Sequence, residues 1–104
     1  MPPVIDEIRQ RILQACPSIS LIVLFGSRAR GEAGADSDYD LLVVAPPDVP
    51  AGTRAARLRL ALWDVPGSFD VVVVSETDFE ATRGFRSGLV HRALAEGVVL
   101  HEAA

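Results

Sequence analysis

Residues 19–45 read ISLIVLFGSRARGEAGADSDYDLLVVA and decide the fold. Two strand-like segments, 19–25 and 38–45, enclose a stretch that is rich in glycine, arginine and acidic residues. The first segment is short, β-branched and nearly all apolar, which is typical of a strand covered on both faces of a sheet. We therefore expect two strands here, the first ended by Gly26-Ser27 and joined to the second by a short helical turn and a loop.

The chain on both sides of this region predicts further helices and strands. Before it, apolar residues recur with a period near 3.6 over residues 4–16, which predicts an amphipathic helix that Pro17 ends. After it, the spacing of arginine and leucine predicts a second helix over 51–63, with Asp48 as a candidate cap. The apolar segment 69–74 predicts a third strand.

The last third of the chain predicts a broken helical region and an edge strand. Ser75 and Asp78 resemble a capping box, so a helix should follow the third strand. Glycines near the middle of this region predict an interruption, after which the helix resumes over 89–95 and ends at Gly97. Residues 98–101 predict a short edge strand.

The length and charge of the chain limit its function. At 104 residues we expect one α/β (α+β) domain over residues 1–104, too small to include a separate substrate-binding domain. A partner should therefore help to hold whatever the chain acts on. The net charge of -4 and the pI near 5.0 disfavour binding along a nucleic-acid backbone. The hydrophobic share of 49% excludes 8 glycines, so apolar surface should be available for a partner.

Cysteine content and hydropathy predict a cytoplasmic protein. The single cysteine, Cys16, has no partner for an internal disulfide, and its place at the end of an amphipathic helix predicts a small core residue. No basic segment precedes an apolar stretch at the N-terminus, and no apolar run is longer than the five residues 21–25. We therefore expect neither a secretory signal nor a membrane span.

Asp38 and Asp40 are the first candidates for chemistry. They are two residues apart in a predicted strand, so both carboxylates should project from the same face. Adjacent like charges repel, and a divalent cation would neutralise them. Oxygen ligands without a Cys or His cluster favour Mg²⁺ or Mn²⁺ over Zn²⁺. The alternative is structural, because acids at alternate positions are common on half-exposed strands.

Gly26 and Ser27 predict a phosphate-binding turn that faces these carboxylates. Ser27 should lie where a strand passes into a helical turn, and the amides and dipole of a helix N-terminus attract phosphate. Gly26 would let a phosphate approach the backbone closely. A Gly-Ser turn alone is common. A phosphate cradle opposite two metal-binding carboxylates, however, is the arrangement that phosphoryl or nucleotidyl transfer requires.

Asp70 is the third acidic candidate, because it places a charge in an otherwise apolar strand. An unpaired charge there is costly and needs a reason. If its strand neighbours that of Asp38 and Asp40, the three acids converge on one edge of the sheet. Asp70 could then bind the metal that activates an attacking hydroxyl, or accept its proton. A strand-end aspartate that faces solvent is the structural alternative.

These residues together resemble a known signature. The Gly-Ser turn, followed after ten residues by Asp38-Tyr39-Asp40, resembles the Gly-Ser and Asp-x-Asp pattern of the DNA polymerase beta-like nucleotidyltransferase superfamily. The run FGSRARGEAGADSDYDLLVV is similar to minimal nucleotidyltransferases, and the likeness extends through Asp70 to the C-terminal EGVVL. The resemblance implies a small nucleotidyltransferase fold, with a mixed β-sheet flanked by helices and the active site at one sheet edge.

The resemblance also implies roles for individual residues. Gly26 and Ser27 would bind the triphosphate of ATP, the substrate that the resemblance implies. The three acids would be the catalytic and metal-binding residues for Mg²⁺ or Mn²⁺, namely Asp38, Asp40 and Asp70.

The arginines and histidines give weaker signals. Arg28 and Arg30 fall inside the family's Arg-Ala-Arg-Gly segment, and either is a candidate to contact the nucleotide or a partner's acidic residues, with solvation as the alternative. His91 and His101 form no cluster in the sequence, so we expect surface or packing positions. The other arginines could bind a partner or RNA, but solvated helix faces are the default interpretation: Arg54, Arg57, Arg59, Arg83, Arg86 and Arg92.

The resemblance further implies a partner and a reaction. Minimal nucleotidyltransferases are commonly encoded beside a helical HEPN protein, and such pairs behave as antitoxin and ribonuclease toxin. The implied function is an antitoxin that transfers AMP from ATP to a tyrosine hydroxyl of a HEPN-type toxin within a hetero-oligomer. Two alternatives remain open. One is a non-catalytic module that silences a helical partner by covering its active site, and the other is a transferase that acts on a small molecule.

Overall fold

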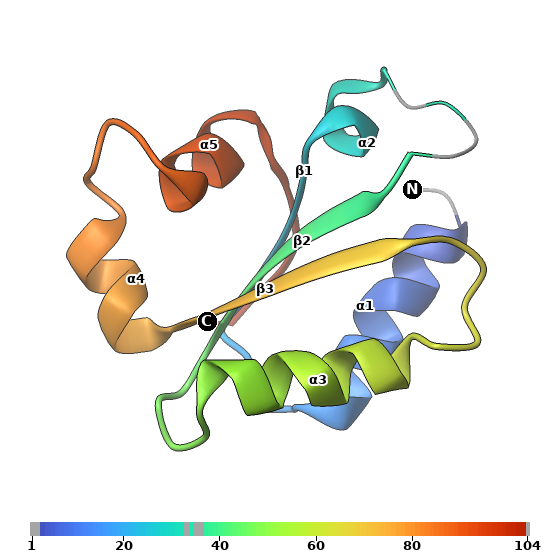
Figure 1. The fold of residues 1–104 in the computed structure, drawn as a ribbon, viewed down its shortest axis with the longest axis horizontal. Coiled ribbons are helices and arrows are strands. Elements are labelled where there is room, and N and C mark those ends of the chain that lie inside the picture. Colours follow the sequence, from blue (N-terminus) through green and yellow to red (C-terminus); the bar gives the residue numbers. More distant parts are fainter. Residues whose placement is uncertain (1–2, 33, 35–36, 104) are drawn as a thin grey trace.

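Helices and strands alternate through most of the chain (Figure 1). The computed structural model describes residues 3–32, 34 and 37–103, so the loop predicted between the first two strands is described only in part. In chain order the elements are α1 (Pro3–Ala15), β1 (Leu21–Phe25), α2 (Ser27–Arg30), β2 (Tyr39–Ala45), α3 (Ala51–Ala61), β3 (Phe69–Ser75), α4 (Glu76–Thr82), α5 (Leu89–Glu96) and β4 (Val98–Glu102). None of the described helices has the length and apolar character needed to cross a membrane.

Four strands form one mixed sheet in the order β3-β2-β1-β4. β1 pairs antiparallel with both β2 and β4, whereas β2 pairs parallel with β3. β4 lies at one edge, as the sequence predicts, and β3 lies at the other. Every residue of β1 is buried, which confirms the prediction of a strand covered on both faces. The α/β (α+β) fold with a mixed sheet is therefore confirmed.

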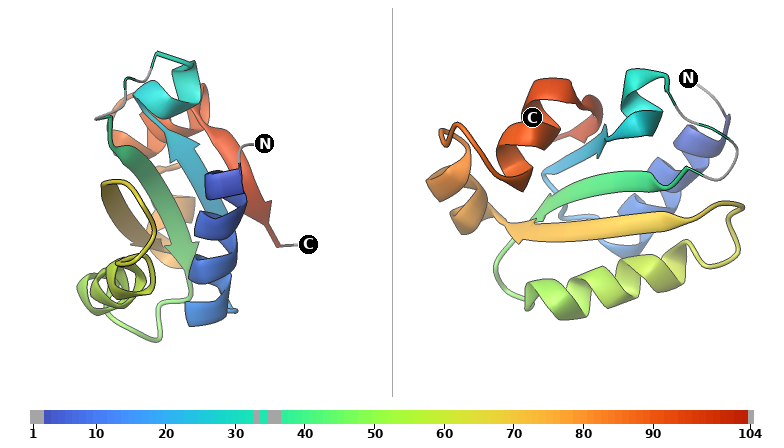
Figure 2. Two further views of the ribbon diagram at one scale, coloured as in Figure 1. Left: turned by 90° about the vertical axis from the view of Figure 1, so that its right-hand side faces the viewer. Right: turned by 45° about the horizontal axis from the view of Figure 1, so that its top comes forward.

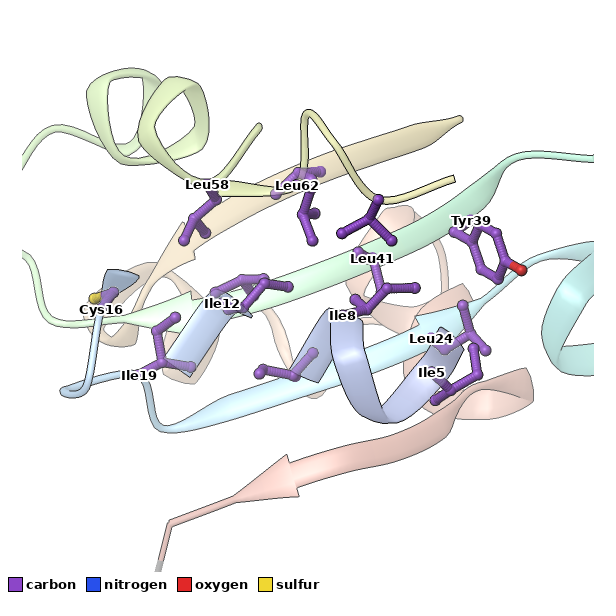
Figure 3. Close-up of a cluster of buried hydrophobic side chains, with 14 of the residues drawn as sticks. Ile5, Ile8, Ile12, Cys16, Ile19, Leu24, Tyr39, Leu41, Leu58 and Leu62 are labelled. Carbon is purple, nitrogen blue, oxygen red and sulfur yellow. The ribbon is translucent and has the colours of Figure 1, made fainter. Parts of the chain in front are cut away.

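Helices cover both faces of this sheet (Figure 2). On one face, α1 and α3 pack over a cluster of buried side chains that includes Ile8 and Leu58 (Figure 3). On the other face, α4 and α5 contribute Phe79 and Ala93 to a second cluster. Cys16 is buried in the first cluster, which confirms its prediction as a core residue.

The strands and helices differ from the predicted boundaries by one or two residues. β2 begins at Tyr39, so Asp38 lies just before the strand rather than within it. The register explains this difference, because β3 begins opposite Tyr39 and β1 ends opposite Asp40. Neither neighbouring strand offers Asp38 a partner with which to continue the ladder. β1 starts at Leu21 and α3 ends at Ala61.

One predicted helix cap is confirmed and one is wrong. Ser75 Oγ accepts a hydrogen bond from the Asp78 amide at 3.1 Å at the start of α4, as predicted. Asp48 does not cap α3, which follows Pro50 without a side-chain cap. Instead, Asp48 Oδ1 accepts a hydrogen bond from Arg54 Nη2 at 2.8 Å. The Arg54 side chain is buried rather than solvated, and a buried guanidinium needs an anionic partner.

Candidate active site

One end of the sheet places two of the predicted acidic residues, Asp40 and Asp70, side by side. Because β1 runs antiparallel to β2, and β2 runs parallel to β3, the end of β1 lies beside the starts of β2 and β3. Asp40 lies opposite Phe25 of β1 and opposite Asp70 of β3. The condition set for Asp70, that its strand neighbours the strand of Asp40, is met. We call this region, with Gly26, Asp38, Asp40 and Asp70, the carboxylate end of the sheet.

Asp40 and Asp70 face the side of the sheet that α4 and α5 cover. Side chains alternate between the two faces of a strand. Leu41 belongs to the cluster under α1 and α3, whereas Leu42 of β2 and Val72 of β3 belong to the cluster under α4 and α5. By this alternation, Asp40 projects with Leu42 and Asp70 with Val72. The two carboxylates are therefore direct neighbours across a strand pair on one face.

Gly26 is required both by its backbone and by its neighbour. Its φ of 75 and ψ of -159 form a combination that residues with a Cβ atom rarely adopt. A Cβ atom here would collide with Oδ2 of Asp40, so the turn lies directly against that carboxylate. The Gly26 carbonyl accepts hydrogen bonds from the amides of Ala29 and Arg30, both at 3.1 Å. Both residues belong to α2, the short helix that starts at Ser27.

Burial and neighbouring charges raise the pKa of Asp40 above its ordinary value. Burial is the largest cause, and the charges of Asp70 and Asp38 act in the same direction. The guanidinium groups of Arg92 and Arg30 oppose this rise in the pKa. Asp40 thus stabilises the fold at pH values below its unfolded pKa, and this stabilisation is lost as the pH rises through the higher folded pKa. A bound divalent cation would instead favour the ionised carboxylate.

The carboxylate end offers only oxygen donors, which suit Mg²⁺ or Mn²⁺. Asp40 and Asp70 lie in register, and Asp38 is exposed two residues before Asp40. Within the described residues, no three His, Cys, Asp or Glu side chains are gathered closely enough to hold a cation. His91 is exposed on α5 and His101 is half-buried on β4. The donor chemistry and the register fit a divalent cation, and the three-aspartate metal set stays a prediction.

The two arginines of the Arg-Ala-Arg-Gly segment have different surroundings. Nε and Nη2 of Arg28 donate to the Ser37 carbonyl at 3.1 and 2.8 Å, and its guanidinium lies 4.2 Å from the centre of the Tyr39 ring. Arg28 therefore connects α2 to the segment that leads into β2. Nη1 of Arg30 instead donates to Glu96 Oε1 on α5 at 3.2 Å. Arg30 is therefore the arginine that links α2 to α5.

Arg92 and Glu96 of α5 also lie beside the site, although the sequence analysis did not single them out for it. The guanidinium of Arg92 lies 5.4 Å from the centre of the Phe25 ring, and Phe25 is the strand partner of Asp40. Arg92 Nε is 3.8 Å from Glu96 Oε1, one turn further along α5. The spacing of four residues could have predicted this ion pair on a helix. It could not have predicted that the pair lies beside the end of β1.

The chain belongs to the nucleotidyltransferase domain family, because the model of that family matches residues 5–99. Among curated relatives, it is similar to the protein adenylyltransferase MntA of Aphanizomenon flos-aquae, with 44% identity over 45 residues. The matched region covers 40% of this chain and 30% of that protein. The comparison thus spans less than a third of the relative's length.

Solved structures share the fold over nearly the whole chain. A crystal structure of a toxin-antitoxin with AMP-PNP has a TM-score of 0.63 at 23% identity, and the match covers 95% of this chain and 73% of that chain. A structure of the tri-AMPylated Shewanella oneidensis HEPN toxin in complex with MNT antitoxin has a TM-score of 0.56 at 21% identity, with 96% and 71% covered. These similarities confirm the predicted nucleotidyltransferase fold.

Proposed function

We propose that this chain is an antitoxin that transfers AMP from ATP to a tyrosine hydroxyl of a HEPN-type ribonuclease toxin, with which it forms a hetero-oligomer in the cytoplasm. The observation that carries the proposal is the carboxylate end of the sheet. There Asp40 lies in register with Asp70, and the glycine of the Gly-Ser turn lies against the Asp40 carboxylate. The acids that would bind a metal and the turn that would bind a phosphate thus lie side by side.

The reaction that we propose is a single displacement at phosphorus. The oxygen of the acceptor hydroxyl forms a bond to the α-phosphorus of ATP. The bond from that phosphorus to the oxygen bridging to the β-phosphate breaks, and pyrophosphate leaves with the electron pair. Mg²⁺ or Mn²⁺ bound by Asp38, Asp40 and Asp70 would supply charge neutralisation for the phosphates and activation of the hydroxyl.

The protein groups have separate tasks in this proposal. Asp70 is positioned at the start of the edge strand β3, where a partner protein can approach, and it can accept the proton of the attacking hydroxyl. The amides that follow Gly26 bind phosphate oxygens, because the missing side chain lets a phosphate approach the backbone. The MntA relative is an adenylyltransferase by name, and both solved neighbours are toxin-antitoxin complexes, which supports this choice of reaction and partner.

Intact mass measurement tests the proposal directly. The HEPN-type protein encoded beside this chain is incubated with the chain, MgCl₂ and ATP, in parallel with an Asp38→Asn, Asp40→Asn double variant. The expected result is a gain of one or more AMP units with the native chain and none with the double variant. Asp6→Asn is the matched control, because Asp6 lies on α1, outside the carboxylate end, where it forms an ion pair with Arg9. An unmodified and still active toxin after incubation with the native chain would contradict the proposal.

Exposed apolar side chains favour a second candidate, a non-catalytic module that silences a helical partner by covering its active site. Trp63 is 82% exposed and Leu60 is 71% exposed at the end of α3, and Phe85 is 60% exposed between α4 and α5. Large exposed apolar side chains of this kind are typical of interaction surfaces. Neutralisation of the toxin that survives unchanged in the double aspartate variant would favour this module over the transferase.

A further inference from the structure

The C-terminal end of α5 is held tightly against β1, close to the carboxylate end. Ala93 is fully buried in the cluster under α4 and α5. Gly97 follows the helix as predicted, and its amide donates to the Ala93 carbonyl at 2.8 Å. A Cβ atom at Gly97 would collide with the Ala93 carbonyl and with Val23 of β1. Because no side chain separates helix and strand here, the direction in which α5 presents its other residues is fixed.

Two guanidinium groups from different elements meet one carboxylate beside the site. Glu96 Oε1 lies 3.2 Å from Nη1 of Arg30 on α2 and 3.8 Å from Nε of Arg92 on α5. The Arg92 side chain is 60% exposed and the Arg30 side chain is 39% exposed, whereas the Glu96 side chain is only 25% exposed. The two cations are thus accessible to a ligand, and Glu96 is the more enclosed group. Nε of Arg30 also donates to Glu32 Oε2 at 3.1 Å, and the Glu32 side chain is 65% exposed.

These cations lie beside the carboxylate end of the sheet. Arg92 also stacks over Phe25, the strand partner of Asp40. Arg30 lies on α2, the short helix that starts directly after Gly26. A nucleoside triphosphate carries about four negative charges, and three nearby carboxylates would repel it unless cations balance both sets. The protein therefore needs to supply positive charge near the phosphates, in addition to the cation that the carboxylates would bind.

We propose that Arg92 and Arg30 form a subsite for the polyphosphate tail of a nucleoside triphosphate, in which Arg92 is a binding residue that no family resemblance assigned. The inference rests on the proposed function. In the free protein Glu96 accepts a hydrogen bond from Arg30 and forms an ion pair with Arg92, while Glu32 accepts a second hydrogen bond from Arg30. The β- and γ-phosphate oxygens replace these carboxylates when the nucleotide binds. Guanidinium groups suit this exchange because they donate paired hydrogen bonds to phosphate as readily as to carboxylate.

Nucleotide binding to the complete chain tests this subsite without requiring transfer. Isothermal titration calorimetry with Mg²⁺ compares AMP-PNP, which has the polyphosphate tail, with AMP, which lacks β- and γ-phosphates. Arg92→Gln should weaken AMP-PNP binding about 10- to 100-fold, the effect of losing one or two charge-assisted hydrogen bonds. AMP binding should not change. Arg92→Lys keeps the positive charge but cannot donate the paired hydrogen bonds of a guanidinium group. Its affinity for AMP-PNP should lie between those of the native chain and Arg92→Gln.

Arg86→Gln is the matched control, since Arg86 is an exposed arginine on the segment between α4 and α5. It should leave both affinities at native values, and thermal unfolding should show that each variant folds. Equal AMP-PNP affinity in the native chain and Arg92→Gln would overturn the subsite. So would an equal loss of AMP and AMP-PNP binding, which would place Arg92 at the nucleoside or in the fold. A native chain that binds neither nucleotide would instead overturn the proposed function on which the subsite rests.

Discussion

The charged side chains beside the two ends of β2 are paired differently. After its C-terminal end, Arg54 is only 7% exposed, and its guanidinium donates to Asp48 and to the Cys16 thiol. At its N-terminal end, Asp40 is half-buried beside the carboxylates of Asp70 and Asp38, and its pKa is raised. One end contains a charge with a matched partner from the same chain. The other end gathers charges of the same sign.

This difference separates a structural charge from a functional one. A buried ion is tolerated when the fold supplies an opposite charge and hydrogen bonds. Like charges placed together raise the free energy of the folded protein, and the expense is tolerated where a ligand neutralises them. The pair around Arg54 should therefore matter for stability, and the carboxylate end should matter for binding and transfer.

The largest expected effect comes from Asp40→Asn. Transfer of AMP should fall by about 10³-fold or more, comparable to the loss of a preorganised group that stabilises charge in the transition state. Stability measured by thermal unfolding at neutral pH without divalent cation should stay the same or rise, because the variant removes a half-buried carboxylate with a raised pKa. A variant with native transfer rates, or one that no longer folds, would show that Asp40 has a different role.

Gly26→Ala should combine a loss of stability with a loss of transfer. The backbone conformation disfavours a Cβ atom, and that atom would push the Asp40 carboxylate out of place. We expect a cost of about 2–3 kcal/mol in the free energy of unfolding, measured by urea denaturation. Gly52→Ala is the control, because a Cβ atom at Gly52 in α3 meets nothing within 4 Å. The control should leave transfer unchanged and raise stability slightly. Equal behaviour of the two variants would contradict the close approach at Gly26.

Asp48→Ala tests the opposite end of the strand. It leaves the buried guanidinium of Arg54 without its anionic partner and should lower the free energy of unfolding by about 1.5 kcal/mol. Arg54→Met should cost less, because the Asp48 side chain is 70% exposed and can return to water. Neither variant should change the affinity for AMP-PNP, since both lie beyond the far end of β2. A larger loss in Arg54→Met than in Asp48→Ala, measured by urea denaturation, would mean that packing outweighs charge there.

Trp63→Ser should have the smallest effect on the protein alone. Trp63 is 82% exposed, so its replacement should change the free energy of unfolding by no more than about 0.5 kcal/mol. Binding to the HEPN-type partner, measured by surface plasmon resonance, should weaken if this end of α3 is part of the interface. Val99→Ser on the β4 edge, where Val99 is 52% exposed, is a comparison at a different apolar surface. Native partner affinity in both variants would place the interface elsewhere.

Much of the carboxylate end could be predicted from the sequence. The apolar run before Gly26 predicts a buried strand, and Asp70 is conspicuous because a charge interrupts an apolar segment. The sequence predicts that the acids converge only if the strand of Asp70 neighbours that of Asp40, and the register shows that these two strands do pair. These features could be predicted because they depend on the spacing and polarity of side chains within a few residues of the sequence.

The prediction was wrong or silent where distant segments meet. The sequence predicts solvated helix faces for most of the remaining arginines, yet Arg54 is buried, because the segments of Cys16 and Asp48 fold against it. Arg92 is exposed, as the default interpretation predicts, but the sequence did not predict its position over Phe25 at the end of β1. Asp38 was expected inside a strand, and only the lengths of the neighbouring strands exclude it.

The sequence by itself determined the order and kind of the elements, the Gly-Ser turn and the acidic residues that are candidates for the chemistry. These depend on the periodicity of apolar side chains and on backbone preferences within single segments. Only the tertiary structure decided which charges are paired within the fold and which are left for a ligand. Contacts between residues far apart in the chain bury the guanidinium of Arg54 and leave that of Arg92 exposed beside the site. Electrostatic energies depend on those distances and on the water that packing excludes.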